Sequence, residues 1–92
     1  MNTNTEQIRL YRVMNVDECY LRKEQSRYIL ETRKMVFKTR YTSHIPVSIS
    51  DEDFEKLKSQ VKTYQGAKAS PIIHEIRKQA IKYLKDTNAF NN

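Results

Sequence analysis

Residues 43–60 read SHIPVSISDEDFEKLKSQ, which predicts a short strand that runs directly into a helix. The apolar residues of the strand are spaced two apart, at Ile45, Val47 and Ile49, as in a strand that buries one face. Ser50 can cap the free amides of a helix, and the three acids that follow it suit the positive end of the helix dipole. Residues 43–60 contain no second strand, so they do not show which strand residues 44–49 pair with.

A second helix is predicted further along the chain. The only glycine, Gly66, is expected to end the first helix, because glycine adopts the left-handed conformation freely. Ser70 and Pro71 then begin the second helix, with serine as the cap and proline at the first helical position. Residues 44–86 therefore have the pattern strand, helix, turn, helix.

The first 43 residues are less regular. Residues 8–13, IRLYRV, can form a short strand, and residues 15–18 have the form of a capping box that predicts a helix from Val16. Residues 27–43 carry five basic side chains against one acid, Glu31, and their apolar spacing fits a strand and a helix equally poorly. Both alternatives remain open for that stretch.

Length and charge limit the classes of function. A chain of 92 residues makes one small domain, and its net charge of +6 favours a polyanionic partner, nucleic acid before membrane. The N-terminus has no signal-peptide pattern and no apolar run is long enough to span a bilayer, so we expect a cytoplasmic protein without a membrane partner. The single cysteine, Cys19, is expected to be an inert thiol.

The sequence shows no pattern typical of an enzyme. His44 and His74 are too few and too far apart to predict a metal site. One glycine cannot build a glycine-rich phosphate loop. We therefore expect no catalytic residues, no metal and no cofactor.

The lone strand suggests its own partner. Residues 44–86 are too few to bury the apolar face of one strand and the apolar stripes of two helices by themselves. We therefore expect two copies of the chain to pair their strands about a two-fold axis. The residues predicted to form the core of that dimer are Ile45, Val47, Ile49, Phe54, Leu57, Ile73, Ile76 and Ala80.

Residues 44–85 resemble the ribbon-helix-helix (Arc/MetJ-type) family of DNA-binding proteins, through IPVSIS, DEDFEKLKSQVKTYQ, GAKAS and PIIHEIRKQAIKYLK. The resemblance implies a mainly α fold, an intertwined homodimer with an intermolecular two-stranded antiparallel ribbon and four helices. Residues 1–43 would then be a basic N-terminal extension, 44–86 the DNA-binding domain and 87–92 a tail.

The resemblance also implies a DNA site. In that family the outward side chains of the ribbon read bases in the major groove and the amino end of the second helix grips phosphate. The residues carried over as base readers are Thr42, His44, Pro46 and Ser48. The residues predicted to contact phosphate are Lys68, Ser70 and Ile72 at that helix end, with Arg33, Lys34, Lys38 and Arg40 on the arm that precedes the ribbon.

The favoured function is a homodimeric, sequence-directed DNA-binding protein, and a transcriptional repressor in particular. A relaxosome accessory protein or a plasmid partition protein is the alternative, and either would use residues 1–43 to dock a second protein. An antitoxin is less favoured, because only DTNAFNN follows the second helix. RNA as the nucleic acid also remains open.

Overall fold

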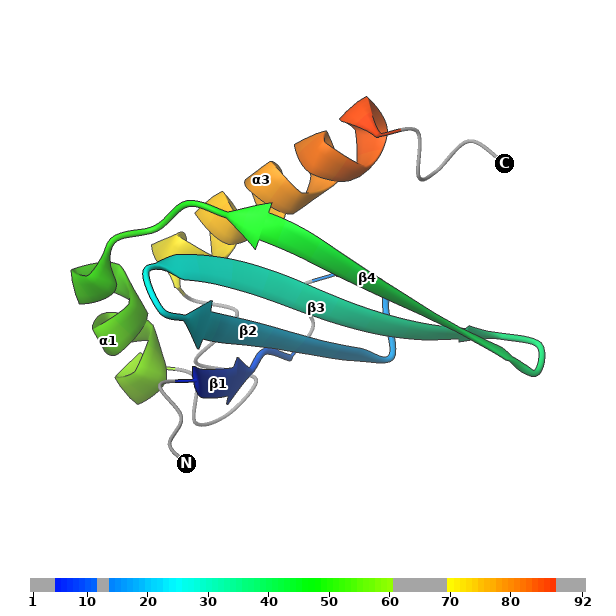
Figure 1. Cartoon of the computed structure of the whole chain (residues 1–92), viewed down its shortest axis with the longest axis horizontal. Coiled ribbons are helices and arrows are strands. Elements are labelled where there is room, and N and C mark those ends of the chain that lie inside the picture. Colours follow the sequence, from blue (N-terminus) through cyan, green and yellow to red (C-terminus); the bar gives the residue numbers. More distant parts are fainter. Residues whose placement is uncertain (1–4, 12–13, 61–69, 88–92) are drawn as a thin grey trace.

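The computed structural model describes residues 5–11, 14–60 and 70–87, which form a four-stranded sheet and two helices (Figure 1). The strands are antiparallel and follow the chain order across the sheet, each paired with the next. The elements in chain order are β1 (Thr5–Arg9), β2 (Glu18–Glu24), β3 (Arg27–Val36), β4 (Thr39–Val47), α1 (Asp51–Gln60) and α3 (Pro71–Asp86).

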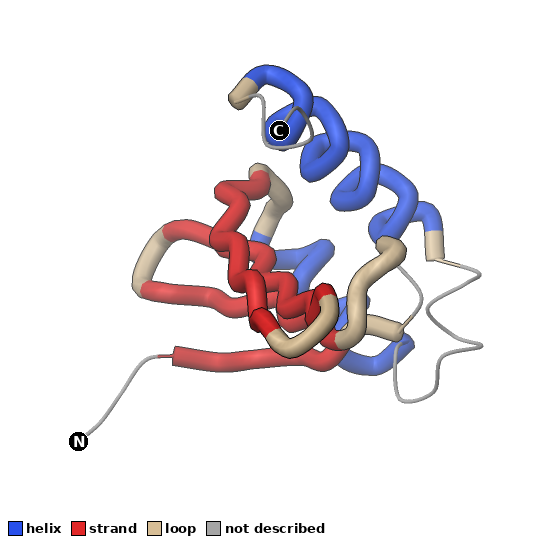
Figure 2. The backbone as a smooth tube through the Cα atoms, turned by 90° about the vertical axis from the view of Figure 1, so that its right-hand side faces the viewer, coloured by secondary structure: helices blue, strands red, loops and turns tan. Residues whose placement is uncertain are grey.

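The core begins with one row of side chains across all four strands. Ile8 pairs with Leu21, Leu21 with Leu30, and Leu30 with Ile45, so four apolar side chains point to the same face. The last three are fully buried. Both helices lie on this side of the sheet (Figure 2), so neither described helix covers the opposite side, which we call the open face.

The two helices bury the apolar stripes that the sequence predicts for them. In α1 the buried residues are Phe54 and Leu57, and the ring of Phe54 lies 5.0 Å from the ring of Tyr28 on β3. The amide of Asp53 donates to the Ser50 hydroxyl at 3.0 Å, which confirms the predicted cap. In α3 the buried residues are Ile73, Ile76, Ala80 and Leu84.

Two hairpins connect the central strands through turns of two residues. The register pairs Glu24 with Arg27, and Val36 with Thr39, so the turns consist of residues 25–26 and 37–38. In each turn the first residue has a positive φ, 59° at Gln25 and 58° at Phe37. This is the φ pattern of a type II′ turn, in which glycine is the usual first residue.

The predicted ribbon-helix-helix fold is wrong. The strand that seemed to lack a partner pairs with β3 of the same chain, because the preceding residues supply three further strands. The predicted dimer core is buried inside one chain, except that Ile49 is only partly buried. A single copy therefore covers the helix stripes that appeared to require a second one.

Two other expectations for the first half of the chain also change. The boundary predicted between residues 43 and 44 falls inside β4, so residues before it belong to the same sheet and core as those after it. The helix predicted from Val16 does not form, since β2 begins at Glu18. The glycine turn around Gly66 lies outside the described residues.

Candidate nucleic-acid interface

The sheet extends at one end into a two-stranded hairpin. The first residue of β2, Glu18, pairs with Arg33, so the part of β3 beyond Arg33 pairs with β4 alone. Residues 33–42, which we call the projecting hairpin, extend away from the rest of the molecule (Figure 1). Its base is tied to the β1–β2 connection, because the amide of Met35 donates to an Asp17 carboxylate oxygen at 2.5 Å.

The projecting hairpin carries concentrated positive charge. It contains four basic side chains, Arg33, Lys34, Lys38 and Arg40, and no acid. Lys34, Lys38 and Arg40 are exposed. Among the described residues, none of these three lies within ion-pairing distance of a carboxylate. All four arm residues predicted to contact phosphate thus occur together on this element.

Three of the four predicted base readers lie on the open face. Thr42, His44 and Pro46 alternate with the buried residues of β4, and Arg40 continues the same row toward the tip of the projecting hairpin. Pro46 is tolerated because β4 is an edge strand, where a missing amide donor breaks no ladder on its outer side.

Ser48, the fourth predicted reader, is placed differently. It follows the end of β4, where its amide donates to Gln79 Oε1 at 2.7 Å and its carbonyl accepts from Gln79 Nε2 at 2.9 Å. These bonds fasten the chain after β4 to α3. The backbone of Ser48 is therefore part of the packing between sheet and helix.

A buried carboxylate lies at the centre of the open face. Glu31 is only 6% exposed, and its oxygens lie 3.2 Å from Arg22, 2.8 Å from Arg33 and 3.5 Å from His44. Burial alone would raise the pKa of Glu31, but the hydrogen bond from Arg33 and the charge of Arg22 outweigh it, so the pKa is lowered. Arg33 is consequently held by Glu31 and is less free than its neighbours to meet a phosphate.

The residues predicted to contact phosphate at the amino end of α3 are less exposed than that prediction requires. Ser70 is 2% exposed and makes no side-chain cap; its hydroxyl donates to Gln60 Oε1 at 2.9 Å. Ile72 packs partly buried against the core. Lys68 lies outside the described residues. Further along α3, Lys78, Lys82 and Lys85 are exposed on the surface.

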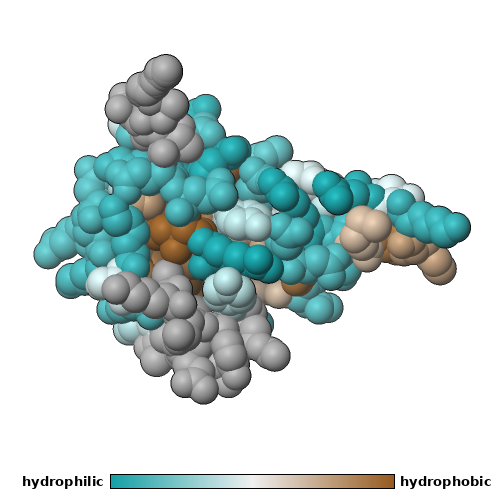
Figure 3. Space-filling model, turned by 90° about the horizontal axis from the view of Figure 1, so that it is seen from below, coloured by the Kyte–Doolittle hydropathy of each residue, from teal (hydrophilic) through white to brown (hydrophobic). Residues whose placement is uncertain are grey.

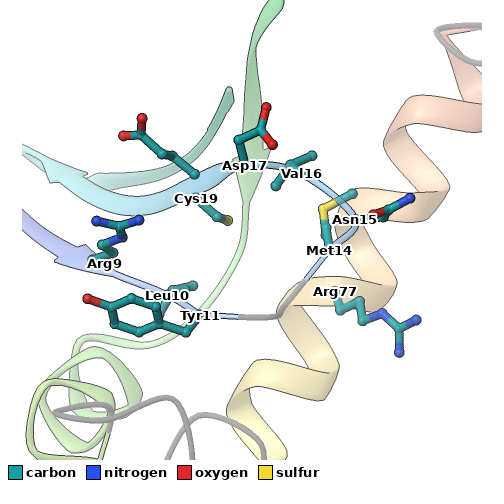
Figure 4. Close-up of a pocket in the computed structure, with 10 residues that line it drawn as sticks. Arg9, Leu10, Tyr11, Met14, Asn15, Val16, Asp17, Cys19 and Arg77 are labelled. Carbon is teal, nitrogen blue, oxygen red and sulfur yellow. The ribbon is translucent and has the colours of Figure 1, made fainter. Parts of the chain in front are cut away.

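A hollow beside the β1–β2 connection contains the single cysteine, Cys19. It is lined by Leu10, Met14, Cys19 and Arg77 among others (Figure 4). Burial raises the pKa of the Cys19 thiol to about 12, so the thiol stays protonated at neutral pH. No group of three or more potential metal ligands occurs among residues 5–11, 14–60 and 70–87.

The end of the projecting hairpin is apolar, which the sequence analysis did not single out. Phe37 is 98% exposed, and Met35, Val36 and Tyr41 are exposed behind it. Figure 3 shows this apolar surface near the end of the hairpin. The signal in the sequence was the apolar run MVF between basic residues, but it becomes visible as a surface only when the hairpin register is known.

No protein-family model, curated protein or solved structure matches this chain. Neither described helix is long and apolar enough to cross a membrane.

Proposed function

We propose that this protein binds double-stranded DNA through the projecting hairpin. The observation that carries the proposal is that the four arm cations predicted to contact phosphate occur together on this element, with the predicted base reader Thr42 among them. Arg33 and Lys34 lie on β3, Lys38 lies in the turn and Arg40 lies on β4, where Thr42 pairs with Arg33.

The shape and charge of the hairpin suit a DNA groove. The major groove is about 12 Å wide and admits a two-stranded ribbon. Thr42 lies on the open face of such a ribbon, where it is placed to reach base edges. Lys34 points to the opposite face of the hairpin, Lys38 lies in the turn and Arg40 lies on the open face, so cations for the phosphates surround the ribbon.

The regulatory role we propose is transcriptional repression by occupation of a DNA site. Because one chain buries its own core, this proposal does not use the exchanged ribbon of the ribbon-helix-helix fold. The number of copies that bind one site is then set by the DNA and not by the need to complete the fold.

The test measures binding of the chain to a fluorescent 30-base-pair duplex across salt concentrations. The logarithm of affinity should fall steeply with the logarithm of salt, by roughly 0.9 per phosphate neutralised. Replacing Lys34, Lys38 and Arg40 together by alanine should weaken binding and reduce that slope by about three.

The matched control removes the same charge from α3. A variant with alanine at Lys78, Lys82 and Lys85 should retain a slope close to that of the parent chain, apart from a uniform loss of attraction. Equal loss in both variants would show that net charge alone governs binding. Greater loss in the helix variant would place the interface on α3 and contradict the proposal.

A further inference from the structure

The tip of the projecting hairpin presents an aromatic ring with no packing partner in the fold. Phe37 is 98% exposed and is the first residue of the two-residue turn. Its φ of 58° falls in the left-handed region, which is uncommon for a bulky residue. Neither its backbone conformation nor its exposure benefits the isolated chain.

The surroundings of Phe37 indicate what the ring is presented to. Lys38 follows it in the turn, and Lys34 and Arg40 stand further back on the two strands, one on each. Cations therefore lie on both strands behind an exposed ring. The arrangement matches a groove in which phosphates line both walls and stacked bases form the floor.

We infer that Phe37 is a wedge that inserts between two adjacent base pairs of the bound duplex, while Lys34, Lys38 and Arg40 contact the phosphates beside it. This inference rests on the proposed function. Apolar side chains of proteins bound in the minor groove enter a base step, unstack it partly and kink the duplex, and a ring delivered from the major groove meets the same stacked step. A rigid two-strand hairpin with the ring at its end can deliver one such side chain to one step.

The inference names the class of DNA that the protein should prefer. Unstacking is easier at pyrimidine–purine steps such as TA, and easier still beside a mismatch. A duplex with one central mismatch should therefore bind more tightly than the matched duplex of the same length. The phosphate contacts are the same on both, so the preference should depend on Phe37 and not on the cations.

A membrane surface is the other partner that could accept an aromatic tip among cations. Phe37, with Met35, Val36 and Tyr41 exposed behind it, offers less apolar area than the lipid chains and long amphipathic helices that anchor proteins stably to membranes. One ring does suffice to occupy one base step. The hairpin therefore favours DNA, and vesicles serve as an arm of the test.

The experiment uses the full chain and a 30-base-pair duplex with 2-aminopurine beside a central TA step, and a second duplex with a mismatch there. Binding of the parent chain should raise the 2-aminopurine fluorescence, and affinity should be about tenfold higher for the mismatched duplex. Phe37→Ala should abolish both effects while leaving the salt slope on matched DNA unchanged. Phe37→Trp should restore the fluorescence change.

The matched control is Val36→Ala, which also truncates an exposed apolar side chain next to the turn and should change neither effect. Circular dichroism and urea unfolding of each variant establish that it is folded. If the parent chain binds DNA without any fluorescence change, the wedge is wrong and the proposed function stands. If the parent chain fails to bind DNA, or shows Phe37-dependent binding only to vesicles of phosphatidylglycerol and phosphatidylcholine, the wedge and the proposed function are both wrong.

Discussion

The hydrogen-bonded ladder between β3 and β4 runs through two regions whose side chains differ in burial. In the body of the sheet Leu30 faces Ile45, and both are fully buried under the helices. In the projecting hairpin Lys34 faces Tyr41 and both are exposed. The backbone ladder continues although the core has ended.

Side-chain burial distinguishes the residues in the body of the sheet, which stabilise the fold, from those in the projecting hairpin, which are exposed to solvent. Most helix and sheet stability comes from burial of an apolar face, and the body of the sheet has one. The hairpin has its backbone ladder and its attachment through Asp17. Substitutions in the hairpin should therefore change binding with little effect on the fold, whereas substitutions in the body should do the reverse.

The largest expected effect comes from truncating the body of β3. Leu30→Ala should lower the free energy of unfolding by about 2–5 kcal/mol, because it leaves a cavity under the helices. Met35→Ala on the same strand should change it by about 0.5 kcal/mol or less, since Met35 is 48% exposed. Urea unfolding compares the two; equal effects would show that the hairpin is packed against a second copy.

The next effect concerns Glu31, which lies where the two regions meet. Glu31→Gln should lower stability by about 1–2 kcal/mol, since Arg22 and Arg33 lose a carboxylate that accepts their charged hydrogen bonds. The same change releases Arg33 and removes one negative charge, so affinity for DNA should rise. Thermal unfolding and duplex binding measure the two results; a fall in both would show that Glu31 positions Arg33 for the DNA.

The dependence on pH follows from the direction of the Glu31 shift. Its pKa is lowered in the folded chain, so its contribution is complete above the unfolded value, near 4.5. That contribution is lost as the pH falls through the folded pKa. The difference in stability between the parent chain and Glu31→Gln should therefore shrink between about pH 5 and pH 3 in urea titrations.

The sequence predicted both helices and the facing of β4, because those features depend on local signals. Caps, acids in the first turn and apolar spacing define a helix within a few residues, and the period of two sets which side of β4 is buried. The predicted core residues other than Ile49 are buried for the same reason. Those local signals did not determine whether the apolar faces of β4 and the helices pack within one chain or against a second copy.

The hairpins were missed because their turns lack the usual residues. Gln25-Ser26 and Phe37-Lys38 contain no glycine, asparagine or aspartate, so neither two-residue turn is visible in the sequence. The alternation of β3 is also hidden, because Glu31 is buried on the open face by an ion pair with Arg22 of β2 and a contact with His44 of β4. Without β3 as a strand, β4 appeared to need a partner from another chain.

The last expected effect is at the tip, where a substitution should leave stability unchanged or raise it. A bulky residue in the left-handed region costs about 1–2 kcal/mol, whereas glycine relieves that strain and costs about 0.5–1 kcal/mol in chain entropy. Phe37→Gly should therefore leave stability unchanged or raise it by about 1 kcal/mol. Lys38→Gly, at the adjacent residue without a positive φ, relieves no strain and should lower stability by about 0.5–1 kcal/mol.

Urea unfolding of the two variants gives the comparison directly. If Phe37→Gly is the more destabilised, the ring supports the fold and the tip belongs with the body of the sheet. If it is the more stable and no longer unstacks DNA, the strained aromatic residue is there for its partner and not for the fold.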